Sequence, residues 1–316
     1  MIPKIVFFGT PQFSATVLKF LYDSDTVDIA SVITRTDKPS KRSIMPVSSL
    51  VKELAISLGI PVFQPIKCST ESFVEVLRSI EADLFIVVAY GEIIRQNVLD
   101  LPRFGCLNVH AGLLPAYRGA APVQRAIMNG ETLSGLTVIR MDAGMDTGAI
   151  LSQEIMEIKE DMTSGDLLQS LSLVAGPLLT KTISGVVSGQ LIGVAQDESK
   201  VSFAPKILKE ESRISWDIDS STVYNKIRAL LPTLLPWSAI QIKREEKKLF
   251  FHEVLKSNVR YDLPPGTILR PSKSEMVIVC REGSIIPIKV QIESKKILHI
   301  KDFLNGISDI NTLTVL

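Results

Sequence analysis

The sequence is poor in cysteine and in histidine, with three residues of each in a chain of 316. Cys68, Cys106 and Cys280 are odd in number and far apart, so the sequence supports neither a disulfide framework nor a CxxC metal site. No structural zinc is therefore expected. Any histidine chemistry has to come from very few positions.

Long apolar runs are also missing. The N-terminal run KIVFFG is too short for a signal peptide and is broken by Gly-Thr-Pro. No later stretch reaches the roughly 18 unbroken apolar residues that a membrane-spanning helix needs. We therefore expect a cytoplasmic protein that has no membrane contact, and we expect a monomer.

The usual nucleotide-binding motifs are absent as well. In VFFGTPQFS only Gly9 stands where G-x-G-x-x-G needs three glycines. The backbone of this turn is therefore not expected to come close to a bound pyrophosphate. There is no Walker A sequence. Dinucleotide binding is not expected, although the fold around this turn can still be of the doubly wound type.

The charge is nearly balanced, at +1, but it is unevenly distributed. From residue 206 onward, 18 Lys and Arg stand against 13 Asp and Glu, a net charge of +5. A basic C-terminal third favours a polyanionic partner. A solvated surface with scattered lysines is the alternative interpretation.

Short β-branched runs alternate with amphipathic stretches up to about residue 155, the pattern of βαβ units. The expected strands are KIVFFG, IASVIT, ADLFIVVAY, GCLNVH, GLTVIRM and GAILSQEI, and the expected helices cover residues 11–22, 46–58, 70–80, 119–129 and 163–188. ADLFIVVAY is apolar without alternation, as expected for a strand covered on both faces. Residues 1–189 are thus predicted to form a Rossmann-like, doubly wound, mostly parallel sheet with helices.

The pattern of apolar and polar residues changes after this region. Residues 190–208 lose periodicity and are expected to form a linker. From residue 209 to 316, apolar and polar residues alternate around turn signals such as Pro-Pro-Gly and Arg-Glu-Gly. This pattern predicts a second domain, a small antiparallel β-barrel of OB-like type.

The stretch GCLNVHAGLLPAYRGAAP carries the strongest candidate site. Asn108 and His110 end a predicted strand, where side chains at i and i+2 point to the same face. An amide can donate to a developing oxyanion, and an imidazole can move a proton near neutral pH. The alternative for His110 is a core imidazole with satisfied hydrogen bonds.

A carboxylate partner can come from MDAGMDTGAIL. Asp142 and Asp146 each precede a glycine by two residues in a loop between two predicted strands, and either can reach the sheet edge. An aspartate in such a loop is also a common turn former. The residues alone leave the choice between the two open.

Three further segments have both a functional and a structural interpretation. Gly119 opens a predicted helix whose N-terminus can hold an anion or can pack closely on the sheet. Tyr90 and Gly91 end a strand and can line an apolar pocket or complete the core. The loop 34–46 can bind phosphates or can be a solvated surface loop. Its cationic residues are Arg35, Lys38, Lys41 and Arg42.

Taken in order, several motifs resemble the methionyl-tRNA formyltransferase family across essentially the whole chain. They are FFGTPQFS, PVFQP, NVHAGLLPAYRGAAPVQRAI, MDAGMDTGAIL, FAPKILKEESRISW and PPGTIL. The Asn-x-His and Leu-Leu-Pro elements are shared with the wider 10-formyltetrahydrofolate transferases and hydrolases. The C-terminal motifs and the basic barrel favour the tRNA enzymes.

The resemblance implies a role for each matching residue. Asn108, His110 and Asp146 match the catalytic positions, which selects Asp146 over Asp142 by analogy. The folate-binding Ser-Leu-Leu-Pro falls on Gly112, Leu113, Leu114 and Pro115, so a glycine replaces the serine. We place Tyr90 and Gly91 in the same pocket.

The resemblance also implies partners and a reaction. The loop cations Arg35, Lys38, Lys41 and Arg42 are expected to contact tRNA, although Ala116 stands where a basic residue is common. The expected reaction moves a formyl group from 10-formyltetrahydrofolate to the α-amino group of methionyl initiator tRNA, without a metal. The alternatives are another 10-formyltetrahydrofolate-dependent formyltransferase or hydrolase with a small substrate, and a nucleic-acid-binding protein that is not an enzyme.

Overall fold

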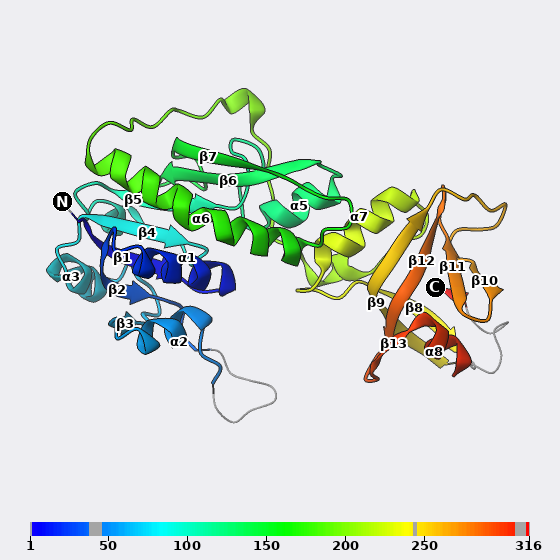
Figure 1. The fold of residues 1–316 in the computed structure, drawn as a ribbon. Coiled ribbons are helices and arrows are strands. Elements are labelled where there is room, and N and C mark those ends of the chain that lie inside the picture. The colour runs from blue at the N-terminus through cyan, green and yellow to red at the C-terminus, as the bar shows by residue number, and fades with distance from the viewer. Residues whose placement is uncertain (1, 38–45, 243–244, 307–313, 316) are drawn as a thin grey trace. The chain divides into compact units, whose positions relative to one another are not determined.

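The computed structural model describes residues 2–37, 46–242, 245–306 and 314–315. The chain divides into two compact units (Figure 1). The N-terminal unit consists of Met1–Pro122, Leu133–Glu157 and Leu168–Pro205, and the C-terminal unit of Val123–Thr132, Ile158–Leu167 and Lys206–Leu316. Each unit has its own sheet.

The sheet of the N-terminal unit has the strand order β3-β2-β1-β4-β5-β6-β7. The first five strands in this order run parallel, whereas β6 and β7 pair antiparallel. The strands are β1 (Lys4–Gly9), β2 (Asp28–Ile33), β3 (Val62–Phe63), β4 (Leu84–Val88), β5 (Cys106–His110), β6 (Leu133–Arg140) and β7 (Ala149–Glu157). This arrangement confirms the predicted Rossmann-like, mostly parallel sheet.

Helices cover this sheet on both faces. The helices up to residue 187 are α1 (Gln12–Asp23), α2 (Leu50–Ser57), α3 (Glu71–Ser79), α4 (Gln96–Leu99), α5 (Pro122–Met128) and α6 (Ser164–Val187). Alternate residues of β1 and β4 pack into a core cluster with residues of α3 and α4. All five residues of β4 are buried, which agrees with its unalternating apolar sequence.

Two helices begin later than the sequence pattern predicts. The helix expected over residues 46–58 begins at Leu50, because the Ser49 side chain accepts the backbone N–H of Lys52 and caps it. The helix expected from residue 119 begins at Pro122, a residue suited to the first helical turn. Before it, Ala121 donates its backbone N–H to the carbonyl of Ala204, so the main chain there is engaged elsewhere.

Helix α6 is, within the described residues, the one helix long and apolar enough to cross a membrane. Leu167, Leu171, Ala175 and Leu179 on it are fully buried, at the four-residue spacing of one helix face. Its Thr182 also contacts Ser152 of β7, hydroxyl to hydroxyl, at 2.6 Å. These features are those of a core helix.

The C-terminal unit contains an antiparallel sheet. Its strands follow the order β10-β11-β12-β9-β8-β14, with β13 beside β12, and the described residues form an open half-barrel. The strands are β8 (Trp237–Ile242), β9 (Glu245–Ser257), β10 (Ile268–Ser272), β11 (Glu275–Val279), β12 (Ser284–Ile292), β13 (Ile297–His299) and β14 (Thr314–Val315). The predicted antiparallel C-terminal β-domain is confirmed.

Helices α7 (Ser220–Leu230) and α8 (Ile300–Asn305) accompany this sheet. The Asp219 side chain caps α7 by accepting the N–H of Thr222. Val223 and Ile227 of α7 pack into a core cluster with Phe251 of β9 and Phe303 of α8. The unit therefore has a hydrophobic core of its own.

Candidate active site

Strand β5 lies between β4 and β6 and delivers two polar side chains to the end of the parallel sheet. Asn108 is half-buried and His110 is buried, with 5% of its side chain exposed. Because they are two residues apart in an extended strand, both lie on the same face. The strand register places Val109 beside Val88, so the loop that follows β4 leaves the sheet next to His110.

The carboxylate of Asp146 joins these two side chains. Its Oδ1 accepts a hydrogen bond from Asn108 Nδ2 at 3.4 Å, and its Oδ2 lies 3.4 Å from His110 Nδ1. The side chain of Asp146 is 16% exposed. An amide, an imidazole and a carboxylate from two separate segments thus converge at the carboxyl end of the parallel strands, where open α/β sheets bind ligands.

The contacts of the His110 ring determine where its proton sits. Nε2 lies 3.0 Å from the carbonyl oxygen of Tyr117, and because a carbonyl only accepts, Nε2 carries the hydrogen. Nδ1, which faces Asp146, is then the nitrogen that gains or loses a proton. Burial lowers the pKa of His110 below its usual range, although the charge of Asp146 and the Tyr117 carbonyl both act to raise it. Burial therefore favours the neutral form of the ring.

The backbone around Asp146 is held in an uncommon conformation. Asp146 has φ of +56°, in the left-handed region, which few residues adopt apart from glycine, asparagine and aspartate. Its Oδ2 accepts the backbone N–H of Gly119 at 2.9 Å. Gly119 has φ of +129°, and a Cβ there would lie 2.7 Å from the carbonyl oxygen of Ala204. A glycine is thus required at the position that donates to the carboxylate.

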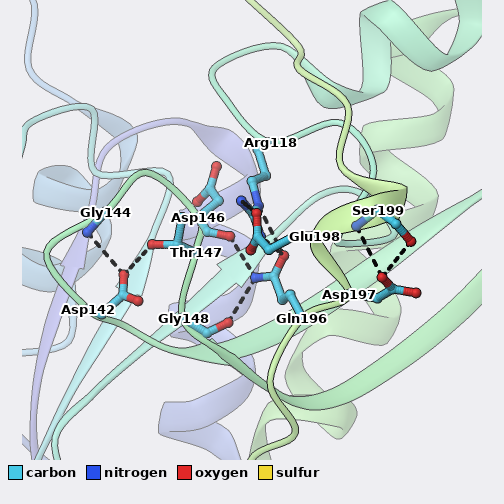
Figure 2. Close-up of polar contacts among 10 residues, drawn as sticks. All are labelled: Arg118, Asp142, Gly144, Asp146, Thr147, Gly148, Gln196, Asp197, Glu198 and Ser199. Carbon is cyan, nitrogen blue, oxygen red and sulfur yellow. Dashed lines mark hydrogen bonds and ion pairs between the residues drawn. The ribbon is translucent and has the colours of Figure 1, made fainter.

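Asp142, the other aspartate of this loop, faces its own turn. Its Oδ1 accepts from the backbone N–H of Gly144 at 3.0 Å and from Thr147 Oγ1 at 2.6 Å (Figure 2). These are the contacts of a turn-forming aspartate. Of the two carboxylates that the sequence left open, the geometry brings Asp146 to Asn108 and His110.

The segment after β5 is fixed to β6. Thr137 Oγ1 donates to the carbonyl of Gly112 at 2.7 Å and accepts the N–H of Leu114 at 3.1 Å. Leu114 is buried, whereas Leu113 and Pro115 are half-buried. A Cβ on Gly112 would stand 3.0 Å from His110 Nε2, so a serine there would require the ring to shift. The glycine matches the position of His110 in this chain.

Tyr90 and Gly91 lie in the loop that follows β4. The Tyr90 ring is buried and meets the Phe8 ring edge-on at 5.5 Å, and burial raises the pKa of its phenol. Its carbonyl accepts Thr10 Oγ1 at 2.8 Å, which ties the ends of β1 and β4 together. The buried Tyr90 hydroxyl lies near the Cys68 thiol. Gly91 is exposed at the rim of the sheet.

Arg35 follows β2 and is the one cation of the predicted tRNA-contacting set that the structure describes. Its side chain is 41% exposed, and Nε lies 3.8 Å from Glu92 Oε1. Lys38, Lys41 and Arg42 lie outside the described residues. No group of three His, Cys, Asp or Glu side chains suited to a metal is found in the described parts of the chain.

Sequence reasoning missed two polar residues beside this site, Arg118 and Gln196. Gln196 Nε2 donates to the carbonyls of Asp146 and Gly148, and its Oε1 accepts from Arg118 (Figure 2). Arg118 lies within the stretch GCLNVHAGLLPAYRGAAP, and Gln196 lies in the segment predicted as a linker. The sequence shows an arginine and a glutamine at these positions, but it does not show their partners, which lie about 80 and 50 residues away along the chain.

Comparisons with known proteins agree on the family. Residues 3–183 match the model described as formyl transferase, and residues 206–308 match formyl transferase, C-terminal domain. The methionyl-tRNA formyltransferase of Chlamydia caviae is 47% identical over 97% of this chain and 96% of its own. That of Clostridium novyi is 38% identical over 96% of each chain.

Solved structures share the fold at low identity. WlaRD, a sugar 3N-formyl transferase crystallised in the presence of dTDP and 5-N-formyl-THF, superposes with a TM-score of 0.63 at 21% identity, covering 94% of this chain and 100% of that one. HypX from Aquifex aeolicus in complex with tetrahydrofolic acid gives 0.64 at 17% identity, covering 97% and 47%. On the two domain matches and the full-length relatives, this chain belongs to the formyl transferase family.

Proposed function

We propose that the protein transfers the formyl group of 10-formyltetrahydrofolate to the α-amino group of methionyl initiator tRNA, producing N-formylmethionyl-tRNA for translation initiation. Full-length relatives of 45–47% identity carry the name of this enzyme. The observation that carries the proposal is the convergence of Asn108, His110 and Asp146 at the sheet edge. Formyl transfer to an amine needs an oxyanion donor and a group that moves a proton, and these three side chains provide both.

The reaction has two bond changes. The neutral amine attacks the formyl carbon, a C–N bond forms, and the carbonyl π pair moves to oxygen. Asn108 Nδ2 donates to this oxyanion. The attacking nitrogen gives up a proton to His110 Nδ1, and the imidazolium, paired with Asp146, adds positive charge near the oxyanion. The intermediate then collapses: the bond to the folate N10 breaks, and N10 receives the proton.

The folate co-substrate is assigned to the ends of β4 and β5. The segment Gly112–Pro115 offers the half-buried Leu113 and Pro115, and Tyr90 and Gly91 form the neighbouring loop. Half-buried apolar side chains of this kind suit the face of a flat ring. The register of β4 against β5 puts both segments beside His110, where the formyl carbon has to lie.

The two ends of the chain receive separate roles. We assign residues 1–189 to catalysis, 190–208 to the connection, and 209–316 to tRNA contact, supported by the net charge of +5 from residue 206 onward. Arg35, Lys38, Lys41 and Arg42 are proposed as further tRNA contacts beside the catalytic unit. The protein is proposed to act as a cytoplasmic monomer.

The first prediction tests catalysis. Asn108→Ala and His110→Ala should each lower kcat for formylation of methionyl initiator tRNA by at least about 100-fold, because each removes a transition-state contact. The measurement is formylation of charged tRNA with 10-formyltetrahydrofolate as donor. Asn97→Ala, an exposed asparagine bonded to the carbonyl of Ser69, is the matched control and should keep its turnover. Turnover near wild type in folded Asn108 and His110 variants would exclude the assignment.

The same assay separates the alternatives. Formylation of small amines or amino sugars but not of charged tRNA would identify a small-substrate transferase. Release of formate without an acceptor would identify a hydrolase. Salt-dependent tRNA binding without consumption of the formyl donor would instead indicate a binding protein.

The second prediction concerns the protonation state of His110. Its pKa is lower in the folded chain than in the unfolded chain, so the unfolded state binds more protons as pH falls through 6.5. The stability that neutral His110 contributes is present above pH 6.5 and is lost as pH falls toward the folded pKa, at a slope of up to about 1.36 kcal/mol per pH unit. For His110→Gln, the free energy of unfolding measured with urea should fall less steeply as the pH is lowered over this range. Equal slopes would contradict a buried neutral imidazole.

The third prediction concerns tRNA. Arg35→Ala should weaken tRNA binding and reduce the slope of log K against log salt by about 1, as expected for the loss of one phosphate contact. Arg78→Ala on α3, a more exposed arginine paired with Glu75, is the control. Filter binding over a salt series measures both. A change in affinity with an unaltered salt slope would argue against a phosphate contact by Arg35.

A further inference from the structure

The segment after α6 reaches back to the loop that carries Asp146. Gln196 Nε2 donates to the carbonyl of Asp146 at 2.7 Å and to the carbonyl of Gly148 at 2.8 Å. Both N–H groups of one amide are thus used on the two sides of Thr147 (Figure 2). We propose that Gln196 is a positioning residue that holds the carboxylate of Asp146 against Asn108 and His110. This inference rests on the proposed function of that site.

The chemistry of the contact requires an amide. The two carbonyls only accept, so they need donors, while Arg118 only donates and needs an acceptor. Gln196 Oε1 accepts from Arg118 Nε at 3.0 Å and from Nη2 at 2.8 Å. A carboxylate at 196 would satisfy Arg118 but would place an oxygen against two carbonyl oxygens. An apolar side chain would satisfy neither neighbour.

Arg118 fixes the orientation of this amide. The side chain of Arg118 is only 4% exposed, and its guanidinium forms a two-pronged pair with Glu198, at 2.8 Å for Nη2–Oε1 and 3.3 Å for Nη1–Oε2. Glu198 reaches into solvent, and its pKa is lowered by the hydrogen bond to Arg118. A buried charge with a planar set of donors holds its acceptors in a defined geometry. Gln196 is one of these acceptors.

The main chain reinforces the same connection. Arg118 and Ser202–Ala204 pair as a short bridge: the N–H of Arg118 donates to the carbonyl of Ser202 at 2.9 Å, and the N–H of Ala204 donates to the carbonyl of Arg118 at 2.7 Å. Earlier in the segment, Val194 exchanges two 2.8 Å hydrogen bonds with Ile150 at the start of β7. Gln196 is therefore held on both sides along the chain, as a positioning residue has to be.

The left-handed backbone of Asp146 explains why the hydrogen bond from Gln196 matters. A left-handed aspartate persists only where the surroundings determine its backbone. Gln196 binds the carbonyl of Asp146 itself, and Gly119 binds its carboxylate. Without the glutamine amide, the loop is free to relax, and the carboxylate moves away from His110. Misplacement by about 1 Å can cost a factor of about 100 in rate.

The test uses two substitutions and a matched control in the full-length protein. Gln196→Glu keeps an acceptor for Arg118 but loses the donors, and Gln196→Met loses both. Gln190→Met, at an exposed glutamine just after α6, is the control. Both Gln196 variants should lower kcat by about 10–100-fold while the KM for the formyl donor stays within about threefold, since Gln196 contacts the Asp146 loop and not the proposed folate segments.

A second readout does not depend on the reaction. His110 is faced by Asp146 from the β6–β7 loop and by the Tyr117 carbonyl from the segment after β5. If Asp146 moves away, its charge no longer raises the pKa of His110, which then falls further. With three histidines in the chain, NMR titration of the imidazole signals can follow His110 in each variant. Gln196→Met, which adds no charge, should titrate at lower pH than wild type, and Gln190→Met should match wild type.

The outcomes separate the two hypotheses. If wild type does not formylate methionyl initiator tRNA, the proposed function fails while the titration still tests the positioning. If wild type is active and the Gln196 variants keep both its kcat and its His110 titration, the positioning role is overturned. A kcat loss that only follows the folded fraction, with an unchanged titration, overturns it as well.

Discussion

The carboxylate of Asp146 connects the parts of the site. It accepts hydrogen bonds from the Asn108 side chain and the Gly119 backbone, its Oδ2 lies 3.4 Å from Nδ1 of His110, and it belongs to a loop residue with a left-handed backbone. Strands β5 and β6 provide a rigid base for these groups. The position of the carboxylate, by contrast, depends on hydrogen bonds from segments far away in sequence. Several independent contacts hold the carboxylate in one position, which defines the geometry of the site.

The environment of His110 explains how a single ring can serve an acyl-transfer reaction. The Tyr117 carbonyl fixes the hydrogen on Nε2, so in the proposed mechanism the proton moves at Nδ1, beside Asp146. Burial favours the neutral ring and Asp146 offsets part of that effect. Gly112 leaves room for this ring, whereas a larger residue would press on it. The glycine that replaces the serine of the Ser-Leu-Leu-Pro pattern therefore lies directly beside the His110 ring.

Much of the N-terminal fold follows from the sequence, because strands buried on both faces must be continuously apolar. β4 illustrates this: its five buried residues are all apolar. The pairing of Asn108 and His110 could also be predicted from the sequence, since strand spacing places both side chains on one face. The pattern did not locate helix starts that depend on local hydrogen bonds, such as the Ser49 cap, or distinguish the two loop aspartates without the family resemblance. Gln196 could not have been found, because no periodicity links it to a loop 50 residues earlier.

The central claim is that His110 and Asp146 act as one unit in formyl transfer, and a double-mutant cycle tests it most directly. The kcat/KM for formylation of methionyl initiator tRNA would be measured for wild type, His110→Ala, Asp146→Ala and the double variant. If the pair works together, the double variant loses little more than either single variant. Losses that add in free energy would show that the two side chains act independently, and would contradict this account of the site.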